Sequence, residues 1–118
     1  MSEAPRTTVY FDGACPVCSR EMAVYRRAKG AAALDFVDVS GPACPAPDLS
    51  REAALARMHA RLPDGRLVSG AAAFGALWSA LPGWRWLGRL VRLPGVSALA
   101  EVAYGLFLRL RRAWRRPR

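Results

Sequence analysis

The sequence predicts a single α/β domain built on a small mixed β-sheet, with extra helices at its C-terminal end. A β-branched and aromatic run at 7–12 precedes a helix-like segment and a second apolar run, which is the order of a parallel βαβ unit. Alternating apolar residues over 58–62, a Pro-Asp-Gly turn and a short run over 66–69 predict an antiparallel hairpin. With 118 residues, the chain is long enough for one hydrophobic core but not for two.

The first strand leads directly into a stretch that holds two of the three cysteines. Asp12-Gly13 predicts a turn in which the glycine is free to take a positive φ. Pro16 suits the first turn of a helix over about 15–29, because its missing N–H is not needed there. Cys15 is therefore expected at the N-terminus of this helix, with Cys18 one turn further on.

The remaining elements follow from periodicity and capping signals. They are a strand over 34–39, a proline-rich loop over 41–47, a helix over 51–57, the hairpin, a helix ending at Pro82-Gly83, and helices over 84–93 and 96–114. Ser50 and Ser69 are expected to cap the helices that follow them. We expect a core over about 7–81 and a basic helical extension over about 84–114.

Four of the predicted helices have an apolar stripe that we expect to face the core. The stripes are Val17, Val24, Tyr25 and Ala28; Phe74, Leu77, Trp78 and Leu81; Trp86, Leu87, Leu90 and Val91; and Leu99, Val102, Ala103, Leu106, Leu110 and Ala113.

The placement of the two cysteines has chemical consequences. A helix N-terminus presents unpaired N–H groups and the positive end of the helix dipole, and both favour a thiolate over a thiol. The sequence therefore suggests that Cys15 attacks a disulfide and that Cys18 resolves the mixed disulfide. Half of a zinc site, or two inert thiols, would have the same spacing. Asp12 is expected either to act on the thiols, as a proton acceptor or by raising a thiol pKa through like-charge repulsion, or to accept N–H bonds from the turn.

The segment Tyr10-Phe11-Asp12-Gly13-Ala14-Cys15-Pro16-Val17-Cys18 resembles the D-x-x-C-x-x-C signature of the DCC family of thiol–disulfide oxidoreductases. Three later segments are similar to that family as well, and they are 36–40, 63–71 and 77–82. The resemblance covers about residues 7–110.

The resemblance implies a thioredoxin-like fold and a dithiol activity that needs no organic cofactor. It assigns Asp12, Cys15 and Cys18 to the site, and the turn and helix-start signals add Gly13 and Pro16 as supporting residues. The sequence departs from thioredoxin-like enzymes at one point. Those enzymes have a cis-proline just before the third strand, whereas Leu55-Ala56-Arg57 precede the hairpin here.

Two further residues have metal-binding or redox chemistry. Cys44, in the proline-rich loop, is expected to be a thiol without a catalytic role, and His59 a residue of the hairpin surface. The alternative is a zinc site made of Cys15, Cys18, Cys44 and His59. No second close cysteine pair accompanies the first, so the sequence favours redox chemistry.

Positive charge is concentrated at the C-terminal end. Residues 1–80 contain nine Lys/Arg and eight Asp/Glu, whereas residues 81–118 contain nine arginines and Glu101 as the only acid. We expect a helix packed on the core with a solvated basic tail. Contact with an anionic membrane is the alternative, and nucleic-acid binding is disfavoured. The arginines expected to contact such a membrane are Arg109, Arg112, Arg115 and Arg116.

The start of the chain has no apolar signal core, and no apolar run approaches the roughly 20 residues of a membrane span. The expected location is therefore the cytoplasm, with peripheral membrane contact as an option. The expected partner is a protein or small molecule carrying a thiol or disulfide. A second class of function is a non-enzymatic adaptor, stabilised by zinc or bound to an anionic membrane.

Overall fold

Four short strands form one mixed sheet in the computed structural model, which describes residues 6–114. The strands are β1 (Thr7–Phe11), β2 (Leu34–Asp38), β3 (His59–Arg61) and β4 (Leu67–Ser69), in the order β2-β1-β3-β4. β1 pairs with β2 in parallel, and β3 pairs antiparallel with both β1 and β4. The predicted βαβ unit and hairpin are both present. The mixed α/β architecture is that of a thioredoxin-like fold with extra C-terminal helices.

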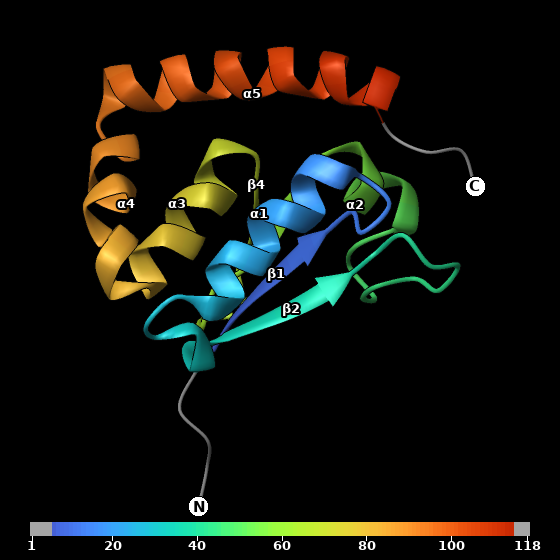
Figure 1. Ribbon diagram of the computed structural model, residues 1–118, viewed down its shortest axis with the longest axis horizontal. Coiled ribbons are helices and arrows are strands. Elements are labelled where there is room, and N and C mark those ends of the chain that lie inside the picture. The colour runs from blue at the N-terminus through green and yellow to red at the C-terminus, as the bar shows by residue number, and fades with distance from the viewer. Residues whose placement is uncertain (1–5, 115–118) are drawn as a thin grey trace, which may run out of the picture.

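Within the described residues, five α-helices surround the sheet (Figure 1). They are α1 (Pro16–Arg27), α2 (Arg51–Ala56), α3 (Ala71–Ala80), α4 (Arg85–Val91) and α5 (Pro94–Trp114), with 3-10 turns at Ala31–Ala33 and Pro82–Trp84. The predicted cap at Ser50 is confirmed, because its hydroxyl accepts the N–H of Ala53 at 3.1 Å. The predicted cap at Ser69 is wrong, since α3 begins after Gly70 and has no side-chain cap.

The two faces of the sheet have separate cores, because neighbouring residues of a strand point to opposite faces. Val9 and Phe11 of β1 join Met22 and Tyr25 of α1 and Leu77 of α3 in the larger core. On the other face lies a smaller cluster made of Tyr10, Val39, Leu49 and Ala54. The larger core therefore supports the helix that carries the cysteines.

The prediction that the apolar stripes of the helices face the core is only partly confirmed. In α1, Tyr25 is buried, but Val24 is 53% exposed, and Met22 lies in the core instead. Leu77 and Leu81 are buried as predicted. In α4, the side of the helix that packs on the protein is made by Gly88 and Val91, whereas Trp86 and Leu90 are exposed.

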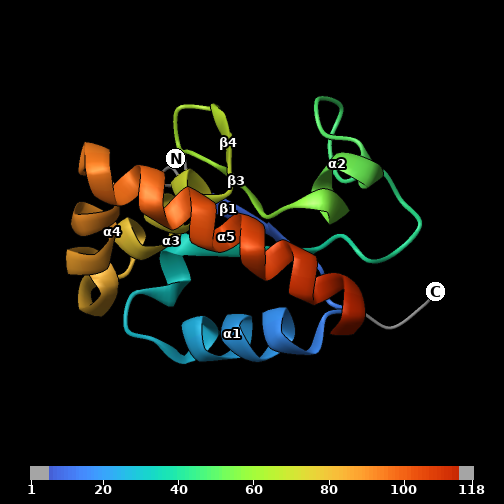
Figure 2. The ribbon, with the colours of Figure 1, turned by 90° about the horizontal axis from the view of Figure 1, so that it is seen from above.

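The largest difference concerns α5, which lies across the molecule as an outer helix (Figures 1 and 2). The predicted core stripe of this helix faces solvent, with Leu99 70% and Leu106 56% exposed. The face turned to the protein carries Tyr104, Phe107, Leu108 and Arg111. These side chains take the inner position because aromatic rings and a carbonyl are available to them there. The Tyr104 ring stands edge-on to the Phe74 ring, with 5.4 Å between the two ring centroids. The guanidinium of Arg111 donates to the Leu55 carbonyl.

Candidate functional site

Cys15 is the N-cap residue of α1, at the carboxyl end of β1. Its backbone is extended (φ −85°, ψ 119°), and its N–H donates to the carbonyl of Asp12 at 3.1 Å. The Sγ atom accepts the backbone N–H of Cys18 at 3.5 Å. Pro16 occupies the first turn, as predicted. The sulfur of Cys15 therefore takes the place that a capping oxygen takes in other helices, where N–H groups favour negative charge.

At Gly13, the carboxylate of Asp38 approaches the backbone closely, and this contact, not a positive φ, is the reason for a glycine. Among the described glycines, positive φ occurs at Gly30, Gly65 and Gly70 only, so the predicted reason is wrong. The N–H of Gly13 donates to the carboxylate of Asp38 at 2.9 Å. A Cβ at this position would lie 2.0 Å from an oxygen of the same carboxylate. The glycine thus lets the end of β2 hold the turn that precedes Cys15.

Asp12 is almost completely buried, at 2% exposure. One carboxylate oxygen accepts the N–H of Ala14 at 3.0 Å, so the residue does serve as a turn acceptor. Asp12 also lines a small cavity that Cys18 shares. The two roles considered for this side chain are therefore compatible in one position.

The small cavity lies between α1 and α5 and has a volume of about 20 Å³. Its polar lining residues are Asp12, Cys18, Glu21, Tyr104 and Arg111, and the rest of its surface is apolar. A space of this size holds about one water molecule. In Figure 2, the C-terminal part of α5 passes beside the start of α1. Cys15 itself has no exposed surface, and Cys18 is half-buried.

Burial and the neighbouring Cys15 raise the pKa of Cys18 to about 12. The burial effect comes first, because a thiolate loses hydration in an apolar environment. Arg111 acts in the opposite direction, since its guanidinium interacts with the Cys18 sulfur and lowers the pKa. Cys18 is therefore held as a thiol at neutral pH, beside a cation that favours its thiolate.

The alkylation rate of Cys18 is expected to stay low at neutral pH and to rise towards a midpoint near pH 12. The pKa of Cys18 in the folded protein is raised above the ordinary value of 9.0, which applies to the unfolded chain. The folded state therefore favours the thiol, and this contribution to the free energy of unfolding is lost as the pH rises from 9 to about 12. The rate is measured by mass spectrometry of the alkylated protein. In Arg111→Gln, the midpoint should move higher. A midpoint at or below 9.0 in the unsubstituted protein would contradict the assignment.

Three residues of this environment were missed by sequence reasoning, and they are Glu21, Tyr104 and Arg111. Glu21 had a signal, because it stands three positions after Cys18 on the same helix, a spacing that brings side chains together. Its pKa is raised by burial, and it accepts the hydroxyl of Tyr25 at 3.0 Å. Tyr104 and Arg111 come from α5 and had no local signal.

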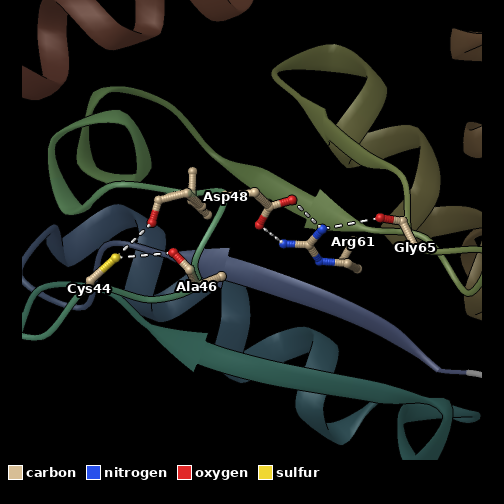
Figure 3. A network of polar contacts seen from close by, with 6 residues as sticks. Cys44, Ala46, Asp48, Arg61 and Gly65 are labelled. Atoms are coloured by element: carbon tan, nitrogen blue, oxygen red, sulfur yellow. Dashed lines mark hydrogen bonds and ion pairs between the residues drawn. The ribbon is translucent and has the colours of Figure 1, made fainter.

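Cys44 and His59 lie outside this site. The Cys44 thiol donates to the carbonyls of Ala46 and Leu49, at 3.1 and 3.3 Å, in the loop after β2 (Figure 3). The ring of His59 contacts the Arg57 carbonyl through Nδ1, at 2.9 Å. Across residues 6–114, no group of three or more His, Cys, Asp or Glu side chains is arranged to hold a metal ion. The residues of the alternative zinc site are therefore not brought together.

Comparisons with known proteins give the family. The model of DCC1-like thiol-disulfide oxidoreductases matches residues 9–117. An uncharacterized chloroplastic protein of Arabidopsis thaliana is 29% identical over 105 residues, which cover 86% of this chain and 49% of that protein. The chain thus spans about half the length of this curated relative. No solved structure matches significantly. Because the family model covers nearly the whole chain, the protein belongs to the DCC1-like thiol-disulfide oxidoreductase family.

Proposed function

We propose that the protein is an enzyme that exchanges thiols and disulfides, with Cys15 as the attacking and Cys18 as the resolving thiol. The observation that carries this proposal is the Cys18 N–H directed at the Cys15 sulfur, at the N-terminus of α1. The N-terminus of a helix favours negative charge, and burial raises the pKa of Cys18. The two sulfurs are therefore in different environments, as an attacking and a resolving thiol require.

The reaction proceeds in two exchange steps. The Cys15 thiolate attacks one sulfur of a substrate disulfide, the substrate S–S bond breaks, and the other substrate sulfur leaves as a thiolate. Cys18 then loses its proton and attacks Cys15 Sγ, which releases the second substrate sulfur. The substrate gains two electrons, and the enzyme ends with a Cys15–Cys18 disulfide. A dithiol reductant restores the enzyme.

In this proposal, a carboxylate that shares the small cavity with Cys18 receives its proton. Asp12 and Glu21 both line the small cavity that Cys18 lines. Burial raises the pKa of Glu21, so its carboxylate is a stronger base than an exposed glutamate. Arg111 favours the Cys18 thiolate once it forms. Asp12 and Glu21 therefore share the role of base, and Arg111 stabilises the charge.

Substrate access requires movement of α5. Cys15 has no exposed surface, and Tyr104, Phe107 and Arg111 of α5 line the cavity beside Cys18. The hydroxyl of Tyr104 accepts the N–H of Met58 at 2.5 Å, just before β3. Thioredoxin-like enzymes have their cis-proline near this point of the chain. We therefore expect α5 to open locally before a protein disulfide reaches the thiols.

A redox titration tests the proposal. The protein is equilibrated at set thiol/disulfide ratios, alkylated, digested with trypsin and weighed. Trypsin separates residues 7–20, which hold Cys15 and Cys18, from residues 30–51, which hold Cys44. The first peptide should lose two alkyl groups in one reversible two-electron transition, while the second keeps its single group. A pair that stays fully alkylated at every ratio would overturn the proposal.

A further inference from the structure

The outward face of α5 carries a row of large aliphatic side chains in solvent. Leu99, Val102, Leu106 and Leu110 are exposed to 70, 63, 56 and 55%. They lie three or four positions apart, so they form one stripe along the helix. The stripe is about 16 Å long at 1.5 Å per residue. A continuous apolar patch of this kind marks an interaction surface. We name these four residues the α5 stripe.

Positive charge borders the α5 stripe. Arg109 and Arg112 are exposed on the same helix, and α4 adds the exposed Arg85, Arg89 and Arg92. The one acid between residues 81 and 118 is Glu101, which forms an ion pair with Arg57. The outer helices therefore present apolar side chains together with arginines, and no unpaired carboxylate among their described residues opposes an anion.

We propose that the α5 stripe docks on the surface of a lipid bilayer that contains anionic headgroups. The aliphatic side chains enter the boundary between headgroups and acyl chains, while Arg109 and Arg112 contact the anionic headgroups. Of the predicted membrane-contacting arginines, Arg115 and Arg116 lie outside the described residues. The proposal does not depend on the redox activity.

Two other occupants fit the surface less well. Nucleic acid would pair with the arginines but would leave the apolar stripe exposed, because its backbone is charged throughout. A second copy of the chain would cover the stripe but would bring two arginine-rich faces together. An anionic bilayer satisfies both the apolar and the charged parts of the surface.

The contact is parallel to the membrane surface in this proposal. No single helix within residues 6–114 has the length and apolar composition to cross a bilayer. Pro82–Val91 and Pro94–Ala113 reach those limits only as a pair, across a bend of 100°. The inner face of α5 is also engaged, since Tyr104 and Arg111 are buried against the protein. The outer face alone is therefore available to lipid.

Vesicle co-sedimentation of the full chain tests the docking. The vesicles are phosphatidylcholine alone, and phosphatidylcholine with about one third phosphatidylserine. We expect binding to the anionic vesicles to be at least about tenfold stronger, and to weaken with salt. The double variant Leu99→Gln/Leu106→Gln should bind at least about tenfold more weakly than the unsubstituted chain, because two apolar side chains no longer enter the membrane. Arg109→Gln/Arg112→Gln should lose most of the preference for anionic vesicles.

Val24→Gln is the matched control, because Val24 is 53% exposed on α1 and lies outside the α5 stripe. It should bind as the unsubstituted chain does. All four proteins should unfold at similar temperatures, since the substituted side chains are exposed. The proposal is overturned if the unsubstituted chain ignores both vesicles, or if the Leu99→Gln/Leu106→Gln variant binds equally well. It is also overturned if light scattering shows a lipid-free dimer that this variant dissociates.

Discussion

Cys15→Ser is expected to abolish thiol–disulfide exchange, with turnover falling by at least about 1000-fold, as happens when an enzyme loses its nucleophile. A serine hydroxyl at the start of α1 does not ionise at neutral pH, so it cannot attack a disulfide. Cys18→Ser is expected to keep the first step and to accumulate the mixed disulfide on Cys15. Turnover is measured with a disulfide substrate and a dithiol reductant, and mass spectrometry detects the trapped adduct.

Cys44→Ser is the control for this pair, because its thiol lies in the loop after β2 and outside the site. It should turn over at the rate of the unsubstituted chain. Full activity in both Cys15→Ser and Cys18→Ser would refute the dithiol mechanism. Accumulation of the adduct in Cys15→Ser, with no adduct in Cys18→Ser, would reverse the two roles.

Tyr104→Ala is expected to detach α5 from the site and to lower the free energy of unfolding by about 3–5 kcal/mol, the usual cost of removing a buried aromatic ring. The ring is 8% exposed and packs against Phe74 and Phe107. Its hydroxyl also accepts the N–H of Met58. Without these contacts, alkylation of Cys15 and Cys18 should speed up under conditions where the rest of the fold persists.

Leu77→Ala is the matched control for the loss of stability. Leu77 has no exposed surface, lies in α3 and belongs to the same core, and its truncation costs about 2–5 kcal/mol. Chemical denaturation gives the stability, and timed alkylation gives thiol access. Tyr104→Phe should keep α5 in place and lose about 1–2 kcal/mol with the hydrogen bond. If Leu77→Ala exposes the thiols as quickly as Tyr104→Ala does, α5 is not the cover.

Much of the site is predictable because its parts are close together in the chain. Strand, turn and helix around Cys15 depend on β-propensity, on Asp12-Gly13 and on the proline at the first turn, all within one short segment. The capping position of Cys15 follows from this local order. The fold class follows as well, because a βαβ unit and a hairpin permit few arrangements.

Gly13 shows where local reasoning ends. A turn glycine suggests a positive φ, but this residue is needed because Asp38 of β2 approaches its backbone. The approach depends on β1 and β2 lying side by side, with Phe11 opposite Asp38. The sequence predicts the turn, whereas the contact with Asp38 depends on a neighbouring strand.

α5 shows the same limit on a larger scale. Its sequence contains two apolar faces, one with the α5 stripe and one with Tyr104, Phe107 and Leu108. Helical periodicity predicted the first of these as the core face, but periodicity alone does not determine which face meets the protein. Tyr104 packs against the ring of Phe74 and accepts the N–H of Met58, so the face that carries Tyr104 turns inward. Phe74 and Met58 belong to segments that are distant from α5 in the sequence.

The sequence by itself thus determined the sheet, the cysteine-bearing helix and the concentration of arginine at the C-terminal end. Only the tertiary structure decided that Arg111 and Tyr104 line the cavity beside Cys18 and that the α5 stripe faces outward. The physical reason is that propensity and capping act within a few residues, whereas burial depends on which surfaces the rest of the chain provides.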